Sequence, residues 1–169
     1  MPTVEPAPSR SPQPRVRRVL AAAMLAAAGL VSSGCGEMAV RLRAVEPVNL
    51  NEEGESGSVA VRIYQLKDGG RFAQADAAAL WLDDRAALGD DRLADPLTVV
   101  LRPGPALAAP RVVELGKPAA GTRWIGVLAM YPAGAVPPPG ERQRAVLERS
   151  EAEDGVFELS GRRLAVVAR

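Results

Sequence analysis

The chain has 169 residues, 47% of them hydrophobic and 24% charged, with one cysteine and no histidine. Its 21 lysine and arginine residues are balanced by 20 aspartate and glutamate residues, which argues against the basic surface of a nucleic-acid-binding protein. The absence of histidine excludes a Ser-His-Asp hydrolase and removes the commonest neutral metal ligand.

The first 34 residues have the layout of an export signal. An arginine-rich stretch, 15–18, precedes 13 apolar or glycine residues at 19–31. This run suits the apolar part of a signal peptide, about 7–15 residues, and is shorter than the ~20 residues of a membrane-spanning helix. Small residues at 32–34 then precede Cys35, as they do at the cleavage site of lipoprotein signal peptidase. We therefore expect residues 1–34 to be removed.

Cys35 is expected to carry a covalent lipid, with 35–37 as a short tether. A lipid on this residue also accounts for the single cysteine, because an unpaired cysteine in an exported protein otherwise leaves a reactive thiol. Gly36, in place of aspartate, favours the outer membrane under the sorting pattern of enterobacteria. Cleavage after Ser33 or Gly34 by general signal peptidase, which leaves a free thiol, is the alternative.

The rest of the chain, 38–169, is predicted to form one domain of strands with a single helix. Alternating apolar residues predict half-buried strands at 38–45 and 58–66, separated by a long polar loop. Alanine and leucine at helical spacing predict a helix over 75–88. Apolar runs between glycine and proline turns predict later strands at 97–101, 111–115, 123–131 (central), 144–149 (edge), 156–159 and 162–168, with 132–140 irregular. We expect an all-β, two-sheet β-sandwich whose helical insertion, about 72–95, lies between the second and third strands.

No catalytic, metal or cofactor site is expected, and the protein is not expected to be an enzyme. Five aspartates near the end of the helix suggest calcium, but their spacing fits no calcium loop and a solvated helix exit is favoured. Three glutamates of the polar loop form a carboxylate cluster, for which a solvated loop is again favoured over acid–base chemistry. These residues are Asp83, Asp84, Asp90, Asp91 and Asp95, and Glu52, Glu53 and Glu55.

Five other side chains have simpler structural interpretations. Trp81, Trp124, Tyr64 and Tyr131 are expected to pack in the core. Arg62, which lies between two inward-facing strand residues, is expected to face outward or to pair with a carboxylate.

The polar loop at 46–58 is the candidate binding segment. It is longer than the 2–5 residues or so of a usual hairpin loop, and long loops on rigid β scaffolds are often functional. A tether without fixed structure is the alternative.

Two long stretches of the sequence, and several shorter ones that follow them, resemble those of a known family. The longest are Arg43-Ala-Val-Glu-Pro-Val-Asn-Leu-Asn51 and Val59-Ala-Val-Arg-Ile-Tyr-Gln-Leu-Lys-Asp68. Phe72, Ala75-Asp76, Leu88-Gly-Asp90, Leu101-Arg-Pro-Gly104 and Trp124-Ile-Gly-Val-Leu-Ala-Met-Tyr131 follow in matching order. Together with the leader, they resemble the TssJ (SciN-like) lipoproteins of type VI secretion systems over roughly Cys35 to Tyr131.

The resemblance implies a transthyretin-like β-sandwich and a non-enzymatic role on the periplasmic face of the outer membrane. It implies binding to the periplasmic C-terminal region of TssM and, indirectly, assembly with TssL, with no cofactor beyond the lipid and no small-molecule substrate. The loop between the first two strands contacts TssM in this family. Carried over, the expected contacts are Glu46, Pro47, Val48, Asn49, Leu50, Asn51, Glu52 and Glu53. A generic periplasmic β-sandwich lipoprotein that binds a small ligand or another envelope protein is the alternative, and a calcium-dependent or Ser-Lys enzyme is more distant.

Overall fold

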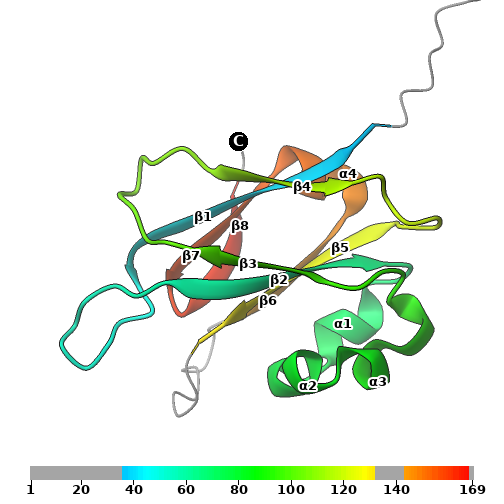
Figure 1. Cartoon of the computed structure of the whole chain (residues 1–169), viewed down its shortest axis with the longest axis horizontal. Helices are drawn as coiled ribbons and strands as arrows, with labels where there is room; N and C mark the ends of the chain where they lie inside the picture. The colour runs from blue at the N-terminus through cyan, green and yellow to red at the C-terminus, as the bar shows by residue number, and fades with distance from the viewer. Residues whose placement is uncertain (1–35, 132–142, 168–169) are drawn as a thin grey trace, which may run out of the picture. The chain divides into compact units, whose positions relative to one another are not determined.

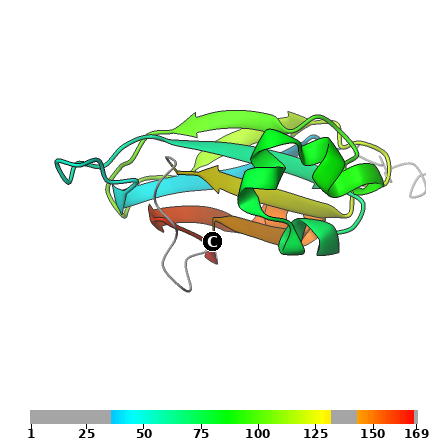
Figure 2. The same cartoon turned by 90° about the horizontal axis from the view of Figure 1, so that it is seen from below.

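The computed structural model describes residues 36–131 and 143–167, in which eight strands form two four-stranded sheets packed face to face (Figures 1 and 2). The expected two-sheet β-sandwich is confirmed. No helix in the described part of the chain is long and apolar enough to cross a bilayer.

The first sheet has the strand order β4-β1-β7-β8. Its strands are β1 (Met38–Val48), β4 (Arg111–Gly116), β7 (Val156–Gly161) and β8 (Arg163–Val167). β1 pairs antiparallel with β4 and parallel with β7, so the strand nearest the N-terminus is joined to the C-terminal hairpin. The predicted hairpin around Ser160-Gly161 is confirmed as β7 and β8.

The second sheet has the order β3-β2-β5-β6 and is antiparallel throughout. Its strands are β2 (Val59–Leu66), β3 (Leu97–Leu101), β5 (Trp124–Met130) and β6 (Arg144–Glu148). β5 is an inner strand and β6 an edge strand, as predicted. A short helix, α4 (Arg149–Asp154), follows β6 and was not predicted.

The core lies between the two sheets and is built from the period-two residues of the inner strands. Val40 and Leu42 of β1, Val61 of β2 and Phe157 of β7 are fully buried in it. Burial of such side chains stabilises the fold by about 1.5–3 kcal/mol each, which explains why the alternation of β1 and β2 was readable from sequence.

The helical insertion between β2 and β3 is confirmed, but its single predicted helix is wrong. The segment forms α1 (Gly70–Gln74), α2 (Ala77–Leu82), α3 (Asp84–Leu88) and the 3-10 turn η1 (Gly89–Asp91). The breaks occur because Asp76 and Asp83 cap new helices: their carboxylates accept hydrogen bonds from the backbone N–H groups of the following first turns.

The helices cover the outer face of the second sheet (Figure 2). They form a second apolar cluster with that face, in which Phe72 and Leu80 are buried against Tyr64 and Leu128. Trp81 and Trp124 are only partly buried at its margin, so their expected place in the core is corrected, whereas Tyr64 and Tyr131 are buried.

The first strand is longer than predicted, which changes the position of the polar loop. β1 continues to Val48, so the connection to β2 is 49–58 and not 46–58. β1 and β2 are also not neighbours, because they belong to different sheets. The connection therefore crosses from one sheet to the other at one end of the sandwich (Figure 1). The prediction for 132–140 lies outside the described residues.

Candidate functional site

The connection 49–58, which we call the crossing loop, is closed by its own hydrogen bonds. Asn51 donates its backbone N–H to the carbonyl of Glu55 at 3.0 Å, and its side-chain oxygen accepts from the N–H of Glu55 at 2.7 Å. Leu50 and Ser56 form an isolated antiparallel bridge. These contacts make the loop a small ordered hairpin, and the alternative of a tether without fixed structure is wrong.

The base of the crossing loop depends on Asn49, which has a left-handed backbone with φ of 47°. Its side-chain amide donates to the carbonyl of Ser58 at 2.7 Å, and its N–H donates to the carbonyl of Gly161 at 3.0 Å. Gly57 lies so close that a Cβ there would be 2.9 Å from the carbonyl oxygen of Asn49. Asparagine tolerates this conformation better than most residues, so Asn49 shapes the loop as well as lying in it.

The eight predicted contact residues differ in how far the structure exposes them. Val48 is fully buried as the last residue of β1, so it is a core residue: the alternation of the strand breaks at Val45, which is buried, and Glu46, which is exposed, and a buried side chain follows Pro47. Asn49 is partly buried, and the other six residues are exposed: Glu46, Pro47, Leu50, Asn51, Glu52 and Glu53. Pro47 and Leu50 line one shallow hollow of about 640 Å³ together with Glu46 and Glu55.

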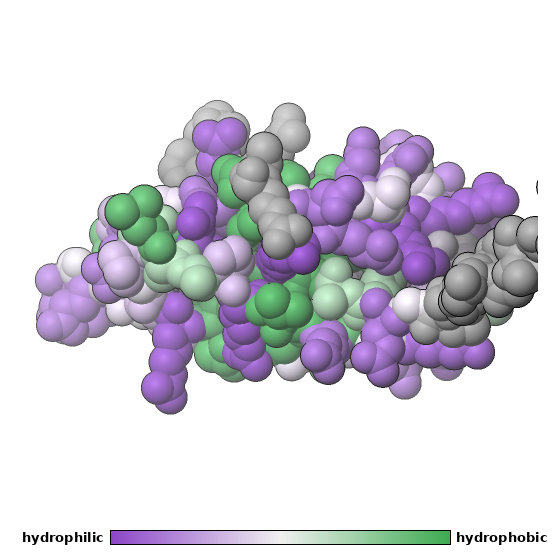
Figure 3. All heavy atoms as spheres, turned by 90° about the horizontal axis from the view of Figure 1, so that it is seen from above, coloured by the Kyte–Doolittle hydropathy of each residue, from purple (hydrophilic) through white to green (hydrophobic). Residues whose placement is uncertain are grey.

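Leu50 is the one large apolar side chain exposed in the crossing loop, with 45% of its surface accessible. Four glutamates at this end of the molecule are also exposed, and two of them, Glu46 and Glu55, line the same hollow as Leu50; the others are Glu52 and Glu53. The tip of this end is accordingly hydrophilic, at the left of Figure 3. An apolar side chain ringed by charges is the arrangement of a protein-binding surface with a polar rim.

Two neighbouring segments at the same end were not recognised from sequence. The β7–β8 turn contacts the loop through a hydrogen bond that the carbonyl of Gly161 accepts from the N–H of Asn49. The connection after β3 approaches β1 through the bridge between Val45 and Gly104. That connection exposes 97% of Leu107. The pairing of β1 with β7 and the bridge between Val45 and Gly104 bring together segments that are distant in sequence.

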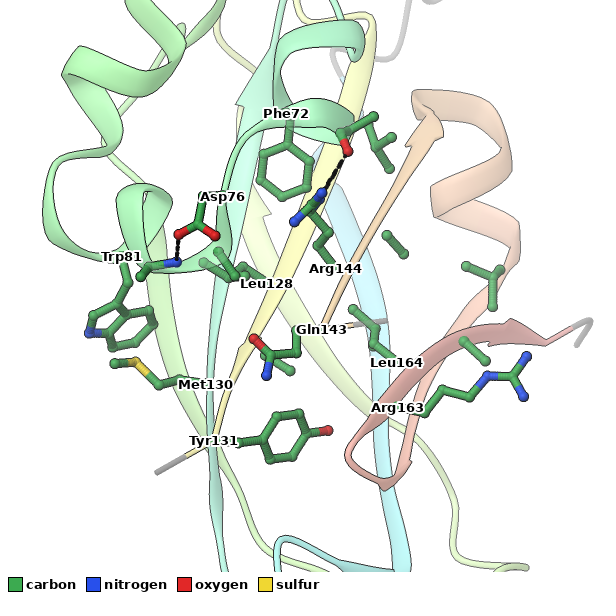
Figure 4. Close-up of a pocket in the computed structure, with 18 of the residues that line it drawn as sticks. Phe72, Asp76, Trp81, Leu128, Met130, Tyr131, Gln143, Arg144, Arg163 and Leu164 are labelled. Atoms are coloured by element: carbon green, nitrogen blue, oxygen red, sulfur yellow. Dashed lines mark hydrogen bonds between the residues drawn. The ribbon is translucent and has the colours of Figure 1, made fainter. Parts of the chain in front are cut away.

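A second candidate is an apolar groove of about 1010 Å³ between the helical insertion, β6 and β8 (Figure 4). Phe72, Trp81, Met130, Tyr131 and Leu164 are among the side chains that line it. A groove of this size and character suits an apolar guest.

Two polar side chains of the groove, Asp76 and Arg144, have hydrogen-bond partners within the chain. The carboxylate of Asp76 accepts from the N–H of Ala78 at 2.8 Å, and the guanidinium of Arg144 donates to the carbonyl of Ala73 at 2.9 and 3.0 Å (Figure 4). The contact of Arg144 holds α1 on the sheet, and Asp76 caps the start of α2. Their geometry supplies neither a nucleophile with a base nor a proton-transfer pair.

Three of the five aspartates near the helices are paired with arginines. Asp84 is buried, and its carboxylate accepts a hydrogen bond from the guanidinium of Arg92 at 2.7 Å. The same carboxylate lies 3.7 Å from the guanidinium of Arg62. Arg92 also pairs with Asp95 at 2.9 Å, and Arg71 lies 3.5 Å from Asp91. The favoured interpretation of a solvated helix exit is therefore wrong for Asp84, and Arg62 pairs with a carboxylate as expected. Across 36–131 and 143–167 there is no group of three or more side chains placed to hold a metal ion.

Comparison with known proteins gives one consistent family. Residues 36–165 match the profile described as "Type VI secretion lipoprotein, VasD, EvfM, TssJ". A chain of the solved structure described as "T6SS protein TssM C-terminal domain (869-1107) from EAEC" is 30% identical, with a TM-score of 0.58 over 78% of this chain and 98% of that one. A chain of a "Type VI membrane complex" is 33% identical, with a TM-score of 0.59 over 77% and 96%.

A third solved structure supports the fold alone. The type VI lipoprotein TssJ1 from Pseudomonas aeruginosa is 24% identical and has a TM-score of 0.60, over 79% of this chain and 98% of that one. The search of curated proteins gave no match.

Proposed function

The chain belongs to the type VI secretion lipoprotein family, and we propose that it is an outer-membrane lipoprotein that binds TssM and helps assemble the secretion membrane complex. Cys35 carries the lipid and holds the domain on the periplasmic face of the outer membrane. The crossing loop binds the periplasmic C-terminal region of TssM, and through it the protein is linked indirectly to TssL. The role is structural rather than enzymatic.

Two similarities support the choice of partner. A chain about one-third identical to this one occurs in a structure described as a type VI membrane complex. Another chain of the same fold occurs in a structure named for the C-terminal domain of TssM. Both matches cover more than three quarters of this chain.

One observation carries the choice of surface: the crossing loop is ordered and presents Leu50 among exposed carboxylates. An ordered loop loses little conformational entropy on binding, so more of the contact energy contributes to affinity. Leu50 supplies apolar contact, and Glu46, Glu52, Glu53 and Glu55 favour a basic complementary surface and faster association. The proposed contacts are therefore Glu46, Pro47, Asn49, Leu50, Asn51, Glu52 and Glu53, without Val48.

The test is a calorimetric titration of residues 36–169, which form one compact unit, against the periplasmic C-terminal region of the cognate TssM. Leu50→Glu is the diagnostic variant, and Leu82→Glu is its matched control, because Leu82 is 83% exposed on α2, away from the loop. We expect saturable binding that Leu50→Glu weakens at least tenfold and Leu82→Glu leaves unchanged. Equal affinity of the two variants would place the interface elsewhere, and no binding to TssM would remove the proposed partner.

The apolar groove supports the alternative function, in which the lipoprotein binds a small apolar ligand or another envelope protein. An environment-sensitive apolar dye gives the simplest test, with Met130→Arg as the variant that fills the groove and Leu82→Glu as the control. Dye binding lost only in Met130→Arg supports a ligand site. Dye binding that is absent, or equal in both variants, contradicts it.

A further inference from the structure

β1 runs the whole length of the sandwich, and its two ends define two different poles. Its first residue, Met38, is paired with Gly116 at the end of β4. Its last residue, Val48, is paired with Gly161 at the β7–β8 turn and accepts a hydrogen bond from Gly57 of the crossing loop. The start of β1 and the crossing loop therefore lie at opposite ends of the molecule (Figure 1).

The pole at Met38, which we call the anchor pole, contains the 117–123 turn, the 67–69 segment and α4. The 117–123 turn is fixed to the end of β2, because the side-chain oxygen of Gln65 accepts from the N–H of Ala119 at 2.7 Å and from the hydroxyl of Thr122 at 3.2 Å. α4 is fixed to the start of β1, since the guanidinium of Arg41 donates to the carbonyl of Glu153. Internal hydrogen bonds thus hold this pole as one rigid surface.

The length of β1 sets the distance between the poles. Its 11 residues span roughly 33 Å at about 3.3 Å per residue. Only Gly36 and Glu37 separate Cys35 from Met38, so even fully extended this tether reaches about 11 Å. The tether is therefore about a third of the length of the strand that follows it.

From this geometry we infer that the domain stands upright on the membrane, with the anchor pole facing the lipid headgroups and the crossing loop presented roughly 30 Å farther into the periplasm. The inference rests on the proposed lipidation of Cys35. The short tether keeps the anchor pole beside the bilayer, and β1 is the rigid spacer that carries the binding loop away from it. The membrane-facing surface is a lipid interface, separate from the surface proposed for TssM.

The loop can approach the bilayer only if the domain lies on its side. The outer face of the first sheet is poorly suited to that position, because β1 and β7 direct Arg43 and Glu158 outward as an ion pair. Burying a charged pair against lipid has a desolvation cost that the upright position avoids.

The test uses the full-length lipidated protein reconstituted into phosphatidylethanolamine–phosphatidylcholine vesicles. With the thiol of Cys35 bonded to lipid, one introduced cysteine is the only free thiol for a fluorescent donor. Glu53→Cys reports on the crossing loop and Lys117→Cys on the anchor pole, since both residues are exposed. Energy transfer is then measured to an acceptor attached to lipid headgroups.

We expect several-fold stronger transfer from position 117 than from position 53. A flexible Gly/Ser insertion of about ten residues after Glu37 should reduce this difference, because such a linker reaches farther without a preferred direction. Flotation with the vesicles combined with equal transfer, or with stronger transfer from position 53, contradicts the upright orientation and leaves the lipid anchor intact. Failure to float contradicts the lipid anchor itself, and with it this inference.

Discussion

The guanidinium of Arg62 on β2 lies 4.0 Å from the centre of the Trp81 ring on α2. The same side chain donates to the carbonyl of Trp81 at 2.9 Å and lies 3.7 Å from the carboxylate of Asp84 at the start of α3. Arg62 thus joins the second sheet to two of the three helices packed on it. The insertion is held in place by this side chain as well as by the apolar cluster beneath it.

Replacing Arg62 with alanine should lower the free energy of unfolding by about 1–2 kcal/mol, because a partly buried cation–π contact is lost. Lysine should not restore the loss, since it cannot match the planar fork that reaches the ring and the carbonyl together. Urea denaturation measures the effect. Arg85→Ala, at an exposed position on α3, is the control, and an equal effect of the two alanine variants would show that the contact with Trp81 is unimportant.

Asn49 should tolerate glycine better than alanine. Both substitutions remove the 2.7 Å hydrogen bond to Ser58, at about 0.5–1.5 kcal/mol, but alanine also strains the left-handed backbone by about 1 kcal/mol or more. Denaturation curves for the two variants should therefore differ, with alanine the less stable. Both variants should weaken binding of TssM, because the base of the crossing loop opens. Equal stabilities would mean that the backbone relaxes away from positive φ at no cost.

Gly126→Ala should destabilise the contact between α1 and the second sheet. A Cβ at this position would lie 2.9 Å from the ring of Phe72, which is fully buried. Overpacking of this kind costs about 1–3 kcal/mol. Phe72→Leu alone should be destabilising. In the double variant Gly126→Ala/Phe72→Leu the smaller side chain should relieve part of the overpacking, and a double-mutant cycle would detect this as a coupling energy. Additive effects would show that the ring moves aside freely.

Tyr64 should make the fold sensitive to alkali. Its hydroxyl donates to the carbonyl of Leu80 at 3.0 Å, and burial raises the pKa of Tyr64 above its ordinary value of 10.0. A raised pKa in the folded state means that its stabilising contribution is fully present below pH 10.0 and is lost as the pH rises through the folded-state pKa.

Comparison with Tyr64→Phe isolates this contribution. The wild type should be more stable than the variant near pH 8, by about 1 kcal/mol for the hydrogen bond, and the difference should shrink above about pH 10. Urea denaturation at several pH values measures both. A difference that stays constant with pH would mean that the phenol does not titrate at a higher pH in the folded state.

Local patterns in the sequence were sufficient to predict most elements. Alternation located β1 and β2, and the continuous apolar run at 123–131 marked β5 as an inner strand, because a strand buried on both faces needs no polar side. These features depend on neighbouring residues alone. The division of the insertion into three helices also depends on local residues, the caps Asp76 and Asp83. It was missed because the alanines around these caps favour one continuous helix.

The candidate site was predicted in part, because some of its features also depend on neighbouring residues alone. The length and polarity of the loop, and Leu50 within it, were visible in the sequence. The burial of Val48 was missed because β1 continues through Pro47, where a proline usually indicates a boundary, and because the alternation of the strand is broken at Val45 and Glu46.

The amino-acid sequence by itself predicted an export signal, and it determined the number and approximate positions of most strands and the acidic loop with one leucine. The tertiary structure alone decided which strands share a sheet, that β1 lies parallel to β7, and that the loop crosses between sheets at the pole opposite Met38. The physical reason is that side-chain periodicity depends on adjacent residues, whereas strand pairing depends on satisfying backbone hydrogen bonds and filling one core across the whole chain. The proposed orientation on a membrane rests on that pairing, which no local pattern contains.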